Sequence, residues 1–344
     1  MKKTAYIVIL NYNGWQDTIE CLESVFKSDY SDYRVVVCDN GSTNDSVEKI
    51  KSWAQGDTVA CVENKEALPT AITKAVFPFI EKSLSFHLYE AENLLKEKDS
   101  TVPGENLILI HSKVNRGFSG GMNMGLRYAM AQEDFAYVWF LNNDIVVDKK
   151  ALSAMVEASD ADVKSCGIYG SVLCDYKKPE IIQCIGGTLN SFSFKTKPVC
   201  RNWKYSELKA GVSLGFYQGA SFLLTRHIAE SMGLFDEAYF LYFEEINFTL
   251  AAREKGFDAA YVKDSVVYHK GAQSTTRLAG VVQDYHFARS RTIFAKRYYP
   301  QRMMFLAYKI FEQVLKYSFK GHFANAKAVM QGARDGFFYQ KNPR

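Results

Sequence analysis

The sequence of 344 residues lacks several features that mark common classes of protein. Its seven cysteines are odd in number and never stand in a Cys-x-x-Cys pair, which indicates reduced thiols rather than a disulfide framework or a zinc site. The dinucleotide fingerprint G-x-G-x-x-G after the first strand and the P-loop are both absent, which weakens the dehydrogenase and ATPase interpretations. Seven largely apolar residues precede Asn11, too few for a signal peptide or a membrane span. We therefore expect a cytoplasmic protein.

Charge is distributed unevenly along the chain. The net charge is +4, but residues 290–344 hold eleven Lys and Arg against two acids, so this end carries +9. The remaining residues therefore carry −5. A near-neutral body argues against nucleic acid as a partner, and the basic, aromatic-rich end suggests contact with an anionic surface.

Apolar periodicity predicts an α/β protein in which strands and helices alternate. Continuous apolar runs that end in polar turns predict strands at residues 5–10, 34–38, 58–62, 107–111, 137–141, 167–173, 221–225 and 260–268. Helical spacing of apolar residues between most of these runs is typical of a parallel sheet with crossover helices.

Two segments depart from this alternation. Residues 64–105 are expected to form an inserted helical excursion, because Leu84, Leu88, Ala91 and Leu95 mark an apolar stripe and a bare loop of that length is uncommon in a compact domain. Residues 284–341 are almost entirely helical in pattern. The length fits one large α/β domain with an appendage, or two modest domains.

Polar side chains gather where the predicted strands end. The four clusters are Asn11-Tyr12-Asn13, Asp39-Asn40-Gly41-Ser42, Asn115-Arg116-Gly117 and Asn142-Asn143-Asp144. Any one of them is ordinary turn chemistry. Because ligands bind at the carboxyl ends of strands in open parallel sheets, four such clusters on neighbouring strands are better explained by a shared ligand.

Two of these clusters suggest how an anionic ligand is held. In residues 115–123, three glycines stand just before a predicted helix, so the backbone can approach a ligand and offer N–H groups to an anion. Asp144 follows a wholly buried strand, and its carboxylate needs compensation. A Mg²⁺ or Mn²⁺ ion that also binds diphosphate oxygens would supply it. The alternative is that Asp144 caps the next helix.

Downstream residues offer a candidate general base and a second metal ligand. Glu244 and Glu245 follow four large apolar residues at a helix start, a setting that raises the pKa of a carboxyl group and suits a general base. The alternative is that they complement the helix dipole. His269 ends another strand and is a metal ligand, a phosphate contact or a buried histidine with its hydrogen bonds satisfied.

Taken in order over residues 4–275, these motifs resemble family 2 glycosyltransferases, inverting nucleotide-sugar-dependent enzymes with a GT-A fold. The matching stretches are residues 8–14, 36–42, 115–123, 141–144, 219–223, 233–237, 242–248 and 269–274. The bacterial rhamnosyltransferase-like members that build cell-surface polysaccharide are the branch they resemble. The resemblance implies a Rossmann-like, mostly parallel sheet flanked by helices in residues 1–285, with a helical region in 286–344.

The resemblance also implies roles for single residues. Asp39 would bind the nucleotide base in a pocket lined by Asn11 and Asn13, with Asn115, Arg116 and Gly117 closing over the nucleotide. Asn143 and Asp144 would contact ribose and metal, His269 would join the metal or diphosphate, and Glu245 would be the catalytic base, with Glu244 as the competing candidate. This sequence has one carboxylate where many members have two in the metal motif, and Glu where the base is usually Asp.

The expected reaction moves a sugar, with rhamnose favoured by the resemblance, from a nucleoside-diphosphate sugar to a hydroxyl of a glycan or lipid-linked acceptor. A sugar nucleotidyltransferase and a non-catalytic nucleotide-sugar-binding subunit are the alternatives. In the tail, apolar residues from Met303 to Tyr317 are interrupted by Lys309, Glu312 and Lys316. This predicts an amphipathic helix that lies peripherally on the anionic inner face of the plasma membrane. The alternative is packing on the catalytic body or on a second subunit, as in a homodimer.

Overall fold

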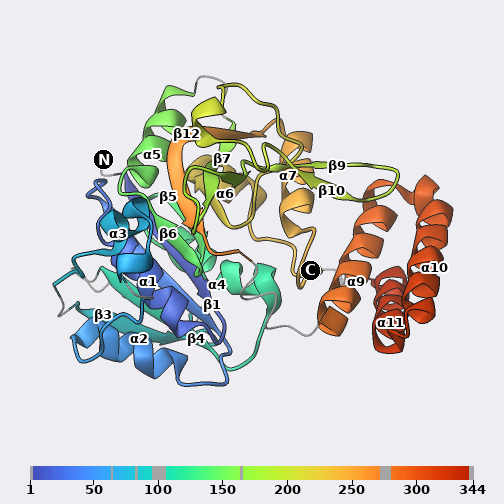
Figure 1. Cartoon of the computed structure of the whole chain (residues 1–344), viewed down its shortest axis with the longest axis horizontal. Coiled ribbons are helices and arrows are strands. Elements are labelled where there is room, and N and C mark those ends of the chain that lie inside the picture. The colour runs from blue at the N-terminus through green and yellow to red at the C-terminus, as the bar shows by residue number, and fades with distance from the viewer. Residues whose placement is uncertain are drawn as a thin grey trace.

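The computed structural model describes residues 3–62, 65–81, 84–94, 106–162, 166–271 and 280–340. It has an α/β body built on one large sheet, beside which three C-terminal helices stand as a separate bundle (Figure 1). The predicted α/β class is confirmed.

The strands of the main sheet lie in the order β3-β4-β2-β1-β5-β11-β7-β12-β6, and β8 pairs with β7. All pairs from β3 to β5 are parallel, and β11 runs antiparallel to both of its neighbours. The strands are β1 (Thr4–Asn11), β2 (Tyr33–Asn40), β3 (Phe86–Glu90), β4 (Leu107–Ser112), β5 (Phe135–Asn142), β6 (Ile145–Val147), β7 (Gly167–Asp175), β8 (Ile182–Cys184), β11 (Ser221–Thr225) and β12 (Asp258–His269). A separate hairpin pairs β9 (Gly187–Leu189) with β10 (Thr196–Pro198).

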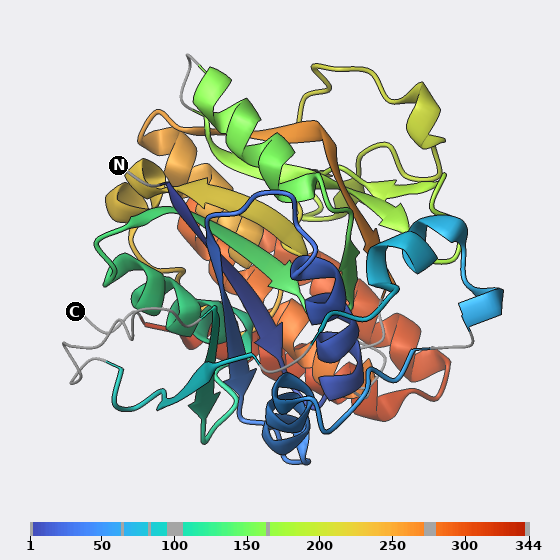
Figure 2. The same cartoon turned by 90° about the vertical axis from the view of Figure 1, so that its left-hand side faces the viewer.

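Helices cover both faces of the sheet. The α-helices are α1 (Trp15–Val25), α2 (Ser46–Gln55), α3 (Thr70–Val76), α4 (Gly117–Met130), α5 (Ala151–Ala161), α6 (Arg226–Met232), α7 (Glu244–Glu254), α9 (Gly280–Tyr298), α10 (Met303–Phe319) and α11 (Phe323–Phe338). Short 3-10 turns lie at Lys65–Ala67, Tyr205–Glu207 and Pro300–Arg302. Ile7 packs with residues of α1 and α2 while its neighbour Val8 packs with residues of α4, so β1 is buried on both sides. The helices that cover the sheet lie on both of its faces in Figure 2. Burial on both faces explains why β1 has a continuous apolar run instead of an alternating pattern.

Strand register brings the polar strand ends together. Asn11 at the end of β1 pairs with Asp39 of β2, and Asp39 pairs with His111 of β4. On the other side of β1, Leu10 pairs with Asn142 of β5. β2, the next strand in the chain, lies on one side of β1, and β5 lies on the other side. This is the switch point at which open α/β sheets bind ligands.

Two local predictions need correction. Residues 58–62 form no strand. The segment 64–105, expected to be helical, contains the short helix α3 and also the edge strand β3. The stripe assigned to a helix was misleading because Leu88 is 37% exposed while its neighbour Tyr89 is 5% exposed, which is the alternation of an edge strand; Leu95 lies outside the described residues.

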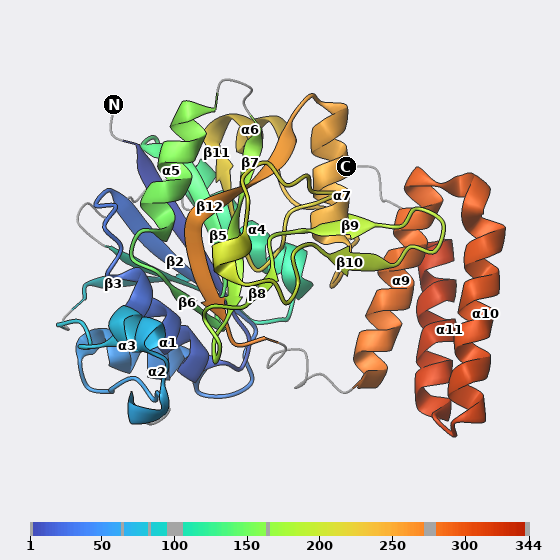
Figure 3. The same ribbon diagram turned by 45° about the horizontal axis from the view of Figure 1, so that its top comes forward.

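The C-terminal helices form an antiparallel bundle at one end of the molecule (Figures 1 and 3). The predicted boundary at residues 285/286 falls inside α9, which begins at Gly280. Phe294 of α9 is buried and in ring contact with Phe243, and the Ser290 hydroxyl donates to the Leu241 carbonyl oxygen at 2.8 Å. These contacts dock α9 on the segment that precedes α7.

Candidate active site

A cleft of about 340 Å³ lies at the carboxyl ends of β1, β2 and β5. Four of the predicted site residues line it, namely Asn13, Asn115, Gly117 and Asn143. Other lining residues are Tyr12, Asn40, Phe118, Phe240, Val282 and His286. The last two belong to α9, so the tail contributes one wall of the cleft.

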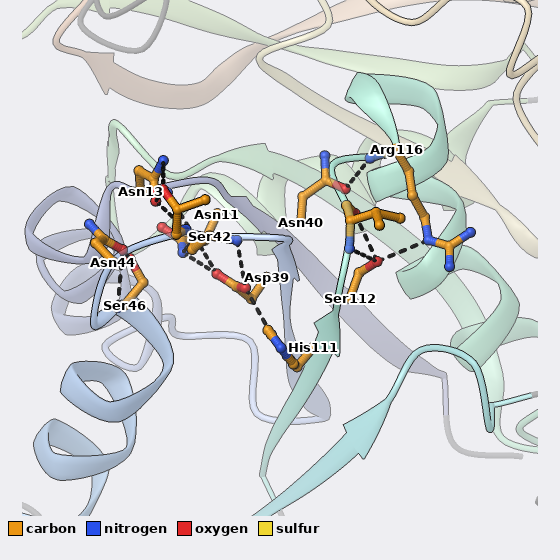
Figure 4. Close-up of polar contacts among 12 residues, drawn as sticks. Asn11, Asn13, Asp39, Asn40, Ser42, Asn44, Ser46, His111, Ser112 and Arg116 are labelled. Carbon is orange, nitrogen blue, oxygen red and sulfur yellow. Dashed lines mark hydrogen bonds and ion pairs between the residues drawn. The ribbon is translucent and has the colours of Figure 1, made fainter.

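Asn11 and Asp39 lie behind the cleft wall in a closed hydrogen-bond network (Figure 4). The Asn11 amide donates to Asp39 Oδ1 at 2.7 Å, and the Ser42 hydroxyl donates to the same oxygen at 2.5 Å. Asp39 Oδ2 accepts from the Ser42 backbone N–H at 3.2 Å and lies 3.0 Å from His111 Nδ1. The Asp39 carboxylate therefore holds the turn after β2 in place, and its contact with a nucleotide base stays a prediction.

Asn13 connects this turn to the one after β1. Its backbone is left-handed, with a φ of 55°, which asparagine tolerates better than most residues. The Asn13 N–H donates to Ser42 Oγ at 2.8 Å, and Asn13 Oδ1 accepts from the Thr43 N–H at 2.8 Å. The two turns thus form one rigid rim of the cleft.

Asn40 shapes the glycine-rich segment on the opposite rim. Asn40 Oδ1 accepts from the Arg116 N–H at 2.9 Å (Figure 4). The Asn40 amide nitrogen donates to the Gly117 carbonyl oxygen at 2.9 Å. Gly117 has a φ of 72° and faces the backbone of Phe240 so closely that a Cβ would clash with its carbonyl oxygen. Only glycine fits there, so Asn40 and Gly117 together fix the start of α4 against the cleft.

The other glycines of this segment have a packing role. α4 begins at Gly117, so Gly120 and Gly121 lie inside the helix and not in a loop before it. A Cβ at Gly121 would clash with Leu10, and one at Gly125 with Val8. These glycines let α4 lie close to β1, which a sequence pattern alone does not distinguish from a ligand-binding loop.

Arg116 points away from the turns that bear Asn11 and Asn13 (Figure 4). Its Nε donates to Ser112 Oγ at 3.0 Å, and its terminal nitrogen lies 3.0 Å from the Glu92 carboxylate. Because an exposed ion pair of this kind contributes little free energy, a bound nucleotide could draw Arg116 away from it. The predicted contact between Arg116 and the nucleotide remains a prediction.

Asp144 and His269 form a pair that is suited to a divalent cation. β6 and β12 are antiparallel neighbours, so residues far apart in sequence meet, and Asp144 Oδ1 lies 3.3 Å from His269 Nε2. Gln183 fixes the imidazole, because its amide nitrogen donates to the His269 carbonyl at 2.8 Å and its oxygen lies 2.8 Å from Nδ1. Nδ1 must therefore carry a proton, and Nε2 faces the carboxylate.

At this distance the lone pair on His269 Nε2 and the Asp144 carboxylate oxygen repel each other unless a proton or a metal ion lies between them. Asp144 is 2% exposed, and burial raises its pKa. Hydrogen bonding and charge from His269, with the charge of Lys270, outweigh burial and lower the pKa overall. The carboxylate is therefore ionised at neutral pH. In the part of the chain that the structure describes, no group of three or more His, Cys, Asp or Glu could hold a metal, so a bound ion would need further ligands from water or substrate.

Lys270, the residue after His269, is engaged in a buried ion-pair cluster. Its Nζ lies 2.7 Å from Asp17 Oδ1 and also contacts Glu20, both on α1. Burial lowers the pKa of Lys270, but the two carboxylates outweigh it and raise the pKa overall. The cluster ties the end of β12 to α1 and so holds His269 in position.

Glu244 and Glu245 open α7 in apolar surroundings. Phe243 precedes them in a left-handed conformation with a φ of 69°. Burial raises the pKa of Glu245 to about 7, although backbone N–H groups partly oppose this. Burial and the neighbouring Glu245 raise the pKa of Glu244 well above its ordinary value. Among the described residues, Oε2 of each glutamate has no hydrogen-bond partner, and neither has the nearby Tyr217 hydroxyl.

The two glutamates differ in burial, and neither of them lines the cleft. Glu244 is 9% exposed, whereas Glu245 is partly exposed. A Cβ built on Gly219 would lie 3.9 Å from Glu245 Cβ and 3.9 Å from the ring of Phe118, which lines the cleft. The backbone of Glu245 therefore lies near the lining residue Phe118, and its carboxyl group has a pKa that suits proton transfer at neutral pH.

Sequence reasoning missed several residues that build this site. Asn40 lies in one of the four polar clusters, but a role in ligand binding was predicted only for its neighbour Asp39. His111 and Gln183 gave no signal, because register and strand pairing bring them to the site. His286 was assigned to the tail, but its ring stacks on Phe240, with centroids 4.5 Å apart, inside the cleft.

Comparison of the sequence with known proteins finds a protein family and a relative. The profile of glycosyl transferase family 2 matches residues 6–76 and 90–216. The low-salt glycan biosynthesis hexosyltransferase Agl10 of Haloferax volcanii is 24% identical over 205 residues, which are 56% of this chain and 62% of that protein. The match thus spans less than two thirds of the length of that relative.

Two solved structures share the fold. One is a mannosyltransferase from Pyrobaculum calidifontis in complex with GDP-Man and Mn²⁺, with a TM-score of 0.52 and 13% identity over 98% of this chain and 88% of that one. The other is GalNAc-T7 with UDP, GalNAc and Mn²⁺, with a TM-score of 0.53 and 15% identity over 85% of this chain and 51% of that one. The likeness confirms the predicted GT-A fold.

Proposed function

The chain belongs to glycosyl transferase family 2, and on that premise we propose that it transfers a sugar from a nucleoside-diphosphate sugar to a hydroxyl group of a glycan or lipid-linked acceptor, with inversion. The observation that supports this proposal is a cleft with a polar rim at the ends of β1 and β2, next to which two further features lie. These are the Asp144–His269 pair, in which Asp144 follows the lining residue Asn143, and Glu245, which neighbours Gly219 near the lining residue Phe118. The rim would bind the donor, the Asp144–His269 pair would hold a cation at the diphosphate, and Glu245 would accept the proton of the acceptor.

In the proposed reaction, Glu245 accepts the proton of the acceptor hydroxyl while that oxygen attacks the anomeric carbon. One bond forms to the acceptor oxygen, and the bond to the diphosphate breaks, with its electron pair leaving on the diphosphate. The N-terminal end of α4 at Gly117 lines the cleft, and its helix dipole would favour this negative charge. The N–H groups of Arg116, Gly117 and Phe118 themselves donate to Asn40, Asn115 and Phe240.

Asp144 and His269 would hold a Mg²⁺ or Mn²⁺ ion, which would neutralise charge on the leaving diphosphate. Both solved structures with this fold contain Mn²⁺, which supports a divalent ion here. Gln183 would act through His269 by fixing its ring. Because the described residues offer only these two side chains at the pair, the remaining ligands would come from the diphosphate and water.

The donor sugar is proposed to be a hexose, since the curated relative is named a hexosyltransferase. Rhamnose, and a place in bacterial cell-surface polysaccharide synthesis, stay predictions from the sequence motifs. A non-catalytic nucleotide-sugar-binding subunit is the remaining alternative. The raised pKa of Glu245 beside the cleft favours the enzyme, because a pure binding site has no need of a base poised near neutral pH.

A panel of nucleoside-diphosphate sugars tests this proposal. With Mn²⁺ present, we expect the purified chain to release nucleoside diphosphate slowly from one donor, because water replaces the acceptor, and faster when sugar acceptors are added. Proton NMR of the product should show the inverted anomeric configuration. If no donor is consumed, the chain is a binding subunit, and if configuration is retained, a single displacement is excluded.

A further inference from the structure

The last two helices place their small residues inside and their large apolar residues outside. α11 packs on α9 through Gly332 and Gly336, where a Cβ would clash with the backbone of Tyr285 and Arg289 respectively. Ala326, Ala328 and Val329 of α11 are buried as well. This close helix contact through small residues leaves the larger side chains of α11 to point away from the protein.

The outward surface of α10 and α11 is strongly apolar. Ten of the 17 large apolar side chains that are exposed in the described chain lie on these two helices. On α10 they follow one stripe at helical spacing, Met304, Tyr308, Phe311, Leu315 and Phe319. On α11 they recur every seventh residue, at Phe323, Met330 and Phe337. Met304 is 84% exposed and Phe319 is 88% exposed, so burial in the fold does not explain this stripe.

A groove of about 410 Å³ lies between the two helices and joins the stripes into one surface. Met304, Phe311, Met330 and Phe337 line it. The two helices lie at the end of the molecule remote from α1 and α2 (Figures 1 and 3). We call this surface, made by the eight stripe residues, the apolar face.

Positive charge borders the apolar face. Lys309 and Lys316 lie on α10, Lys320 caps its C-terminal end, and Lys327 and Arg334 lie on α11. The acids of the two helices are Glu312, which lies 2.7 Å from Lys309, and Asp335, which lies 3.0 Å from Arg334. Among the described residues, no ion pair engages Lys316, Lys320 or Lys327.

We propose that the apolar face lies on the surface of an anionic lipid bilayer, with its aromatic and methionine side chains among the acyl chains and its lysines at the headgroups. The charge decides between this occupant and a second copy of the chain. A symmetric dimer through this face would bring together two copies of the same positively charged surface, whereas anionic headgroups neutralise its charge. No described helix has the length and apolar character needed to cross a bilayer.

Binding of the apolar face to a bilayer does not depend on sugar transfer, but it would place the cleft near the lipid surface. The helix α9, which carries α11, also lines the cleft through Val282 and His286. If the proposed transferase function holds, this arrangement favours an acceptor that is anchored in the membrane.

Flotation of the full chain with lipid vesicles tests the proposal. We expect wild type to float with vesicles of phosphatidylcholine mixed with phosphatidylglycerol and to remain behind with phosphatidylcholine alone. The triple variant Lys316→Gln/Lys320→Gln/Lys327→Gln should bind the anionic vesicles about 100-fold more weakly, since each basic group near such a surface contributes about 1 kcal/mol. Phe311→Ser/Phe319→Ser should lose at least about tenfold in binding.

A matched control and a sizing measurement complete this test. Val59→Ser/Trp203→Ser removes exposed apolar groups from the body and should leave vesicle binding unchanged. Circular dichroism should show intact folds, because all substituted side chains point outward. Failure of wild type to float with anionic vesicles would overturn the proposal. So would a wild-type dimer that Phe311→Ser/Phe319→Ser converts to a monomer by light scattering, since the occupant would then be a second copy.

Discussion

Glu245→Gln should abolish sugar transfer and leave donor binding intact. The amide keeps the size of the side chain but cannot accept the proton of the acceptor hydroxyl, and general-base catalysis contributes about 10²- to 10⁴-fold. We therefore expect kcat to fall by at least about 100-fold, while calorimetry finds an unchanged Kd for nucleoside diphosphate with Mn²⁺. Turnover close to wild type would remove Glu245 from the role of base.

Glu244→Gln is the matched control for this substitution. Burial and the neighbouring carboxylate raise the pKa of Glu244 well above its ordinary value, which favours the neutral acid. Glutamine resembles that neutral acid in size and hydrogen bonding, and we expect transfer within about tenfold of wild type. If Glu244→Gln instead stops transfer while Glu245→Gln does not, the roles of the two residues are exchanged.

Asp144→Ala should remove metal-dependent transfer. Outer-sphere partners of a metal commonly contribute about 10- to 100-fold, so loss of the ligand itself should cost more than about 100-fold in kcat/KM. Added Mn²⁺ or Mg²⁺ should not restore the activity. Assays with and without EDTA check this expectation, and full activity of wild type in EDTA would contradict the metal assignment.

Gln183→Leu should reduce transfer less than Asp144→Ala does. Leucine removes the hydrogen bonds that orient His269 but leaves both proposed ligands in place. We expect a loss of about 10- to 100-fold that high Mn²⁺ concentration partly rescues, unlike that of Asp144→Ala. If both variants respond equally to Mn²⁺, Gln183 has no role in orienting a ligand.

Strands buried on both faces were predictable from the sequence because each appears as a short continuous run of apolar residues. Residues 221–225 were predicted as a strand and form β11 over the same residues. The edge strand β3 could not be recognised, because Leu84, Leu88 and Ala91 satisfy a helical spacing and one face of an edge strand is solvated. Contact with β4, which sequence spacing does not reveal, decides in favour of a strand.

The candidate site was predictable where a motif is contiguous and not where pairing assembles it. Asp144, Glu245 and His269 stand out because each carries charge or a ring nitrogen at the end of an apolar run. Gln183 lies in a segment without a clear period and reaches His269 through β8, which pairs with β7 beside β12. The contribution of α9 to the cleft depends on how the tail docks, which no local pattern specifies.

The pH dependence of transfer tests most directly the claim that Glu245 is the base of this reaction. A base acts in its unprotonated form, so a pKa of about 7 predicts full kcat/KM at higher pH. At lower pH, kcat/KM should fall about tenfold for each pH unit. Glu244→Gln should keep this inflection, whereas the residual activity of Glu245→Gln should lack it. A wild-type kcat/KM that stays constant between about pH 5 and about pH 8 would contradict the account.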